Sequence, residues 1–169
     1  MPYVTATEIR NATSNLELAQ VATPRERKPI TAEQMRKAID GDDYSGDPDA
    51  SWITLALGKV NRAVQDASDF LDNYMRLRYA VPLVSPPSTV REIVIRIARY
   101  MLHNERATKE VEERYKEAVK WCRDIAEGII VLDVPAASVL EGDAPLIQEG
   151  AGLYTVEGLS DFASWPSYR

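Results

Sequence analysis

His103 and Cys122 are the first candidates for catalysis, because each is the only residue of its type in the chain. A hydrolase that uses histidine as its base would have to use His103. Helical spacing places His103 on the same strip as Arg96 and Arg99, where positive neighbours disfavour a protonated ring. No partner group is evident in the pattern, so we expect a surface or helix-end histidine instead of a catalytic one.

Cys122 lies on an apolar seam of the last expected helix, where a buried and unreactive thiol is the ordinary outcome. One cysteine and one histidine cannot supply a zinc-ligand pattern. The sequence also lacks a Gly-x-Ser-x-Gly turn and the glycine-rich motifs that bind nucleotide phosphates. The residues therefore predict neither an enzyme nor a bound cofactor.

The loop Asp40–Asp49 contains alternating carboxylates, which suggests calcium as an alternative. An EF-hand loop in this register needs Gly and Glu where Ser45 and Ser51 stand. We therefore expect a solvated turn in which Asp47 caps a helix that starts at Pro48. Cation binding by the loop stays open.

Hydrophobic periodicity predicts a mainly α chain that forms a small helical bundle. The expected helices are Thr5–Ala22, Ala32–Ile39 capped by Thr31, Pro48–Tyr79, Ser88–His103, and Thr108–Gly128 with Thr108 as its cap. The longest helix would measure roughly 46 Å, so we expect part of it to project or to pack on a neighbouring subunit. The Ser88–His103 helix is apolar nearly all round, which predicts a central position.

A short strand is expected at Ile129–Leu132, followed by an extended C-terminal arm over residues 133–169. The arm is too rich in aromatic residues for a solvated linker, so we expect it to order against its own domain, a sister subunit or a partner. Its expected contact residues are Leu153, Tyr154, Leu159, Phe162, Trp165 and Tyr168.

The composition, with 45% hydrophobic and 27% charged residues, fits one globular domain. No apolar run approaches the ~18 residues that a membrane span needs, and no signal peptide is expected from the N-terminal residues. A single cysteine suits a protein made in a reducing cytoplasm.

The formal net charge is -6, and residues 129–169 carry most of it, with Arg169 against six carboxylates. A protein that grips duplex DNA needs clustered Lys and Arg, so DNA binding is not expected. The one mild basic group comprises Arg76, Arg78, Arg91, Arg96, Arg99 and Arg106. Two interpretations stay open for it: ion pairs within the chain, or contacts with an acidic patch on the next subunit of a ring.

Several short sequence motifs between Tyr74 and Gly128 resemble those of a known family, both in their residues and in their order along the chain. They are Tyr74–Leu83, Ile97–Leu102, Arg106–Val111, Arg114–Cys122 and Ala126–Gly128. In this stretch the chain resembles the small head–tail connector (neck) proteins of Mu-like tailed phages. The chain differs from the residues that are usual in the family at Met75, Arg76 and Cys122.

The resemblance implies a non-enzymatic structural protein of the virion, made in the host bacterial cytoplasm and located in the neck. Such proteins form a ring of about twelve subunits, a homo-oligomer between the portal protein and a tail-side neck or tail terminator protein. DNA passes through the ring without sequence recognition. In this interpretation residues 1–132 form a helical adaptor domain, with a core bundle at 48–128, N-terminal helices and a loop at 1–47, and the arm at 133–169.

Arg76, Arg78, Arg96 and Arg99 are the expected inter-subunit contacts, and the arm is the expected portal contact. The alternative function is a helical nucleic-acid-binding regulatory protein, which needs an exposed polar recognition helix. The Ser88–His103 helix is too apolar for that role.

Overall fold

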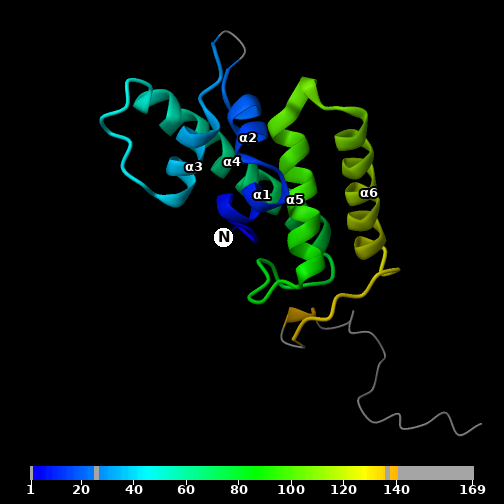
Figure 1. The fold of residues 1–169 in the computed structure, drawn as a ribbon. Coiled ribbons are helices and arrows are strands. Elements are labelled where there is room, and N and C mark those ends of the chain that lie inside the picture. Colours follow the sequence, from blue (N-terminus) through cyan, green and yellow to red (C-terminus); the bar gives the residue numbers. More distant parts are fainter. Residues whose placement is uncertain (1, 25–26, 136–137, 141–169) are drawn as a thin grey trace, which may run out of the picture.

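The structure, a computed structural model, describes residues 2–24, 27–135 and 138–140, and it is mainly helical (Figure 1). The α-helices of this part are α1 (Ala6–Ala12), α2 (Asn15–Ala22), α3 (Ala32–Asp40), α4 (Ala50–Met75), α5 (Ser88–His103) and α6 (Lys109–Ala126), with a 3₁₀ turn η1 (Asn104–Arg106) after α5. The mainly α prediction is confirmed. None of these helices is both long and apolar enough to cross a bilayer.

Helix α5 occupies the centre of the bundle, as its apolar circumference predicts. It contacts α4 along one side and α6 along the other, and α1 and α2 also pack against it (Figure 1). Its buried set includes Val90, Val94, Ile97 and Leu102, which belong to one continuous core. The exposed residues of α5 lie at its N-terminal end, and Arg96 and Arg99 on its polar strip are half-buried.

Helix α4 is the longest, with 26 residues and thus a length of about 39 Å. It is shorter than predicted, because a turn replaces the helix after Met75 and residues before Ala50 form the loop. Buried residues run along it from Ile53 to Met75, and α2, α3, α5 and α6 pack against it. The buried side of α4 is therefore covered by the chain's own helices, while several of its aromatic side chains stay half-buried.

The predicted single helix Thr5–Ala22 is wrong, because the structure has two helices that meet at Thr13 and Ser14. Ser14 is extended, and its Oγ accepts the backbone N–H of Glu17 at 3.0 Å, so it caps α2. The hydroxyl of Thr13 donates to the carbonyl of Ile9 at 2.8 Å and ends α1. Adjacent Thr and Ser side chains compete with the helical backbone in this way.

Two predicted threonine caps are confirmed, Thr31 on α3 and Thr108 on α6, and a third threonine, Thr5, caps α1. The predicted cap at Asp47 is wrong, since Asp49 occupies the N-cap of α4. The carboxylate of Asp47 accepts the N–H of Asp49 at 2.8 Å and thereby closes a turn before the helix.

The strand expected at Ile129–Leu132 is also wrong. In the described part of the chain the only β pairing is an isolated antiparallel bridge between Tyr79 and Val139. Gly128, with φ +79, follows the end of α6. The residues after it alternate between exposed and more buried positions, and in the described part of the chain no strand pairs with them. Strands of this length need neighbours to be stable. The arm beyond Leu140 lies outside the described residues.

Candidate interaction surfaces

A groove of about 270 Å³ lies between α1, α5 and α6 and is lined by the polar strip of α5. Its charged residues are Arg91, Glu92, Arg96 and Arg99 from α5, with Glu8 from α1 and Arg114 from α6. We call it the arginine groove. Two of the arginines predicted for inter-subunit contact, Arg96 and Arg99, therefore share one surface.

Carboxylates of the same chain pair with the arginines of this groove. Arg96 bridges Glu92 on its own helix and Glu117 on α6, the latter at 3.3 Å. Arg114 pairs with Glu110 at 2.8 Å. Because exposed ion pairs contribute only about 0–1 kcal/mol, they can be exchanged for the carboxylates of a partner at little cost. Both interpretations of the arginines, internal pairing and subunit contact, remain compatible with this geometry.

Arg99 belongs to a tighter cluster that joins α5 to α2. Its Nε and Nη2 donate to the two oxygens of Glu17 at 2.7 and 3.1 Å. The Nε2 of His103 lies 2.9 Å from Glu17 Oε1. His103 is the last residue of α5, as predicted, but it is buried with 9% of its surface exposed. Of the two expected positions the helix end is confirmed and the surface is wrong, because α2 brings Glu17 against His103.

Opposing effects act on the pKa of Glu17. Burial favours the neutral acid and raises the pKa, but hydrogen bonds from Arg99 and His103 favour the carboxylate. The net result is a pKa below the usual glutamate value. Glu17 is therefore ionised at neutral pH and ties two helices together, which is a structural role.

Arg76 and Arg78, the other two arginines predicted for subunit contact, lie at the end of α4. Arg76 follows the helix and is exposed. Arg78 is half-buried and its guanidinium lies against Gly128, since a Cβ built on that glycine would be 2.5 Å from Arg78 Nη1. The structure thus separates the four arginines into two surfaces, one along the arginine groove and one at the end of α4.

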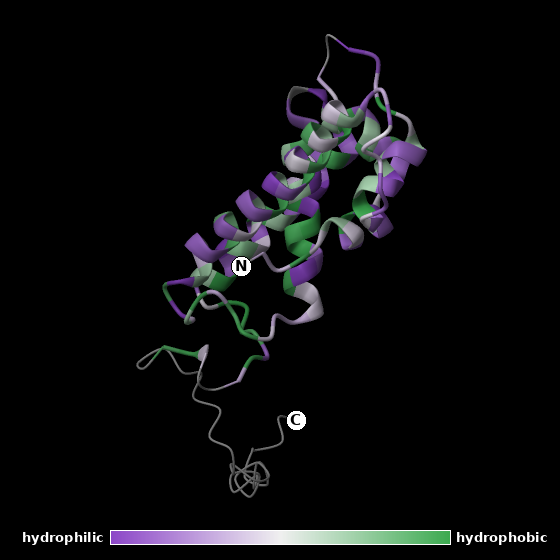
Figure 2. Cartoon of the chain, turned by 90° about the vertical axis from the view of Figure 1, so that its left-hand side faces the viewer, coloured by the Kyte–Doolittle hydropathy of each residue, from purple (hydrophilic) through white to green (hydrophobic). Residues whose placement is uncertain are grey.

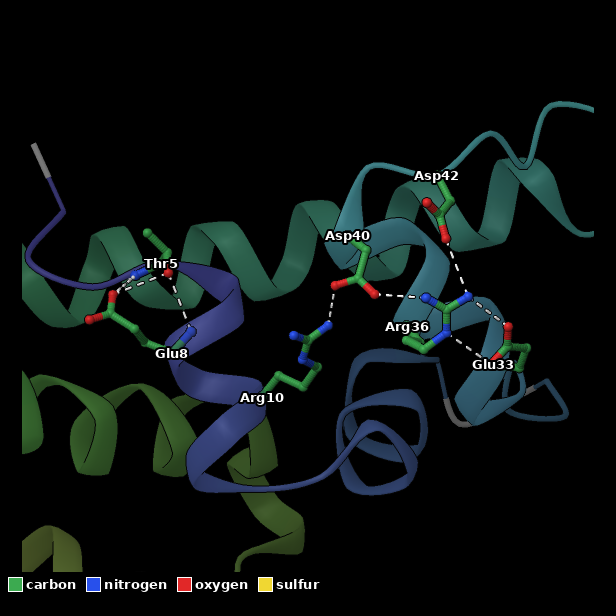
Figure 3. Close-up of polar contacts among 7 residues, drawn as sticks. All are labelled: Thr5, Glu8, Arg10, Glu33, Arg36, Asp40 and Asp42. Carbon is green, nitrogen blue, oxygen red and sulfur yellow. Dashed lines mark hydrogen bonds and ion pairs between the residues drawn. The ribbon is translucent and has the colours of Figure 1, made fainter.

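A second ion-pair network joins α1 to α3 (Figure 3). Arg10 on α1 pairs with Asp40, which also accepts from Arg36 at 2.8 Å. Arg36 in turn pairs with Glu33 at 2.8 Å and with Asp42 at 3.2 Å. The hydrogen bonds of Arg10 and Arg36 lower the pKa of the Asp40 carboxyl. This network holds the short N-terminal helices in place.

The carboxylates of the Asp40–Asp49 loop are engaged with protein groups. Besides the pairs of Asp40 and Asp42 with arginine, Asp43 accepts the N–H of Ser45 at 2.9 Å. Asp47 accepts from Gln34 at 3.0 Å. In the described ranges no group of three or more His, Cys, Asp or Glu side chains is arranged to hold a metal ion.

Cys122 is fully buried, as its seam position predicts. Burial raises the pKa of its thiol to about 12, so the thiol is protonated at neutral pH and is a poor nucleophile. His103 and Cys122 lie on different helices and each is enclosed by packing. Neither occupies the arginine groove.

Three structurally important residues have no signal in the sequence that reveals their role. Glu17 is one, and the buried tyrosines Tyr3 and Tyr79 are the others. Their partners are 53 to 86 positions away in the sequence, so neither helical spacing nor local motifs could identify them. The predicted arm contacts from Leu153 to Tyr168 lie outside the described residues.

Comparison with known proteins identifies the chain's relatives. The family model "Bacteriophage Mu, Gp36" matches residues 3–146. The Mu-like prophage FluMu protein gp36 of Haemophilus influenzae is 32% identical over 107 residues, which are 60% of this chain and 76% of the relative. Gene product J of Escherichia phage Mu is 28% identical over 69 residues, which are 41% of this chain and 49% of the relative. The chain therefore belongs to the Bacteriophage Mu Gp36 family, as a protein of the Mu-like phage type.

Proposed function

We propose that the protein is a head–tail connector of a Mu-like phage particle, located in the neck of the virion. It forms a homo-oligomeric ring of about twelve subunits between the portal protein and a tail-side neck or terminator protein. The ring gives DNA a passage and has no catalytic role, no cofactor and no sequence-specific contact with DNA.

The observation that carries the proposal is family membership over residues 3–146, together with the resemblance of the motifs between Tyr74 and Gly128 to those of connector proteins. The arrangement of the described residues supports an assembly role. Two buried tyrosine hydroxyls hold together loops that are far apart in the sequence, and most of the large exposed apolar side chains gather at one end of the bundle. An exposed apolar patch of this kind is typical of a surface that meets another protein.

The charge distribution supports a DNA passage rather than a DNA-binding surface. The chain carries a net charge of -6, and its arginine groove is lined by carboxylates as well as arginines. Duplex DNA is bound by clustered cations that replace condensed counterions, whereas an acidic wall repels it. The connector role therefore suits the electrostatics better than a nucleic-acid-binding regulatory role.

We assign the subunit contacts of the ring to the arginine groove and to the end of α4, where Arg96, Arg99, Arg76 and Arg78 lie. The C-terminal residues from Leu153 to Tyr168 are the proposed contact with the portal or with an adjacent subunit. Arginine is enriched in such interfaces because it combines charge with a broad apolar stem.

The proposal is tested in phage-producing cells that carry a stop codon early in this gene. Electron microscopy of the lysate is expected to show DNA-filled heads and free tails that are not joined, and supplying the intact gene is expected to restore complete particles. Complete, infectious particles without the protein would overturn the proposal. Empty heads and absent tails would also overturn it, because they would place the protein in an earlier step.

A further inference from the structure

Five of the seven large hydrophobic side chains that are exposed lie at one end of the described bundle. They are Leu77, Val84, Ile129, Val131 and Leu140, with Val84 94%, Ile129 69% and Leu77 65% exposed. We call this surface the apolar end. Figure 2 shows green loops beneath the helices at this end. The other two, Leu16 and Leu55, lie on α2 and α4.

Two buried tyrosine hydroxyls fix the loops of the apolar end. The hydroxyl of Tyr3 accepts the N–H of Leu83 at 3.0 Å and itself donates to Asp72 near the end of α4. The hydroxyl of Tyr79 accepts the N–H of Leu132 at 2.9 Å. Val84 and Val131 are the direct neighbours of these anchored residues. Because its backbone is held in place, the apolar end is a preformed surface, which lowers the ordering cost of binding.

The remaining chain departs from this same surface. The N–H of Ala80 donates to Ser138 O at 2.8 Å, and the N–H of Leu140 donates to Arg78 O at 3.0 Å. These two bonds flank the bridge between Tyr79 and Val139. The last described residue, Leu140, therefore lies beside Arg78 at the rim of the apolar end, and 29 residues follow it in the sequence.

The sequence of that C-terminal segment matches the patch in apolar character and in charge. An apolar residue stands at every third position: Leu153, Val156, Leu159, Phe162, Trp165 and Tyr168. A period of three gives one apolar edge in a three-residue-per-turn helix, the form in which many peptides dock in apolar grooves. Glu157 and Asp161 stand between these positions, and the exposed Arg76 lies next to Leu77 on the patch.

We propose that the apolar end of each subunit binds residues 153–168 of a neighbouring copy of this chain. The inference rests on the proposed ring. We call this contact between neighbouring subunits the joint. Each copy carries both a donor segment and a separate acceptor surface, so the contact is head-to-tail. A head-to-tail contact is the type that closes into rings, whereas a contact between identical patches stops at a dimer.

Site-specific cross-linking in the full-length protein tests the joint. One chain carries Val84→Cys and a second carries Trp165→Cys, and the two are mixed and oxidised. The native Cys122 is buried, and burial raises the pKa of its thiol to about 12, so this thiol is not expected to form a disulfide in the assay. The matched control replaces Val84→Cys by Leu55→Cys, an exposed leucine at a distant site on α4.

A covalent heterodimer of the two variants is expected, in a yield on the order of tenfold above the Leu55→Cys control, because docking raises the local thiol concentration. Two other outcomes overturn the joint. If only a double Val84→Cys/Trp165→Cys chain cross-links, and does so within itself, the segment folds back onto its own subunit. If no cross-link forms in either arrangement, the apolar end serves another protein.

Sedimentation of the Val84→Asp variant separates this inference from the proposed function. Loss of the large assembly is expected, with Leu55→Asp assembling normally. If Val84→Asp still forms a full-size ring, the joint is wrong but the ring stands. If the unmodified chain itself sediments as a monomer, the ring and its joint both fail.

Discussion

Glu17 shows how a single residue can join two helices that the sequence does not connect. It accepts hydrogen bonds from Arg99 and His103, which lie 82 and 86 positions away. The sequence placed both of these residues on one polar strip but offered no means to identify the acid opposite them. Periodicity reports which residues share a face of one helix, and it does not report which helix covers that face.

Replacing Glu17→Gln is expected to lower the free energy of unfolding at neutral pH by about 1–2 kcal/mol, the size of a charged hydrogen bond that is lost. The folded protein lowers the pKa of Glu17, so the stabilisation is present above the ordinary glutamate pKa of about 4.5 and is lost as pH falls through the lower folded value. Urea unfolding at several pH values measures both effects.

The difference between the wild type and Glu17→Gln should therefore shrink as the solution is acidified. Glu113→Gln, at an exposed position of α6, is the matched control and should change little at any pH. A difference that is constant down to the acid transition would show that the ionised form of Glu17 is not what stabilises the fold.

Gly128 and Gly41 offer a matched pair at the ends of helices. Both have φ +79, but only Gly128 has a neighbour, the guanidinium of Arg78, within 4 Å of a built Cβ. Gly41→Ala is expected to cost about 1 kcal/mol from backbone strain alone. Gly128→Ala is expected to cost more, because Arg78 must also move. Thermal unfolding of the two variants compares them, and an equal loss would show that the contact with Arg78 has no energetic weight.

Among the elements, the helices with a clear start signal are the ones that the sequence predicted well. Thr31, Thr108 and the Pro-Pro break before Ser88 mark α3, α6 and α5 correctly. The strand predicted at 129–132 is absent because a β-branched run favours a strand only where a partner strand lies beside it. The break at Thr13 and Ser14 is hidden in the sequence because the apolar positions continue across it.

Ser14 tests whether α2 is an independent element. Ser14→Ala removes the cap of α2, and the expected loss is about 1 kcal/mol of unfolding free energy. Since α2 carries Glu17, the loss of order should extend to the ion cluster with Arg99. Hydrogen exchange of the first amides of α2 measures this locally, with Ser51→Ala on the exposed face of α4 as the control. Unchanged protection of α2 would contradict the capping role.

Tyr79 tests the anchoring of the loop after α6. Tyr79→Phe removes the hydroxyl that accepts the N–H of Leu132, at an expected cost of about 1–2 kcal/mol for a buried donor without a partner. Hydrogen exchange at the Leu132 amide should accelerate, while amides in the middle of α5 keep their protection. If the Leu132 amide exchanges as slowly as before, the tyrosine does not hold the loop.

For the molecule as a whole, the sequence predicted a helical bundle, and the family match places it among Mu-like phage proteins. What the sequence could not predict was how the surface is divided. The arginines separate into a groove and a helix end, and the exposed apolar residues gather where the C-terminal segment departs. This division appears only when residues from loops far apart in the chain are brought together.

A connector must assemble with itself, so the mass of the purified full-length protein in solution is the decisive measurement. Native mass spectrometry or sedimentation velocity over a range of concentrations should find a single closed species of about twelve chains of 18.9 kDa each. A monomer at every concentration would contradict the central claim.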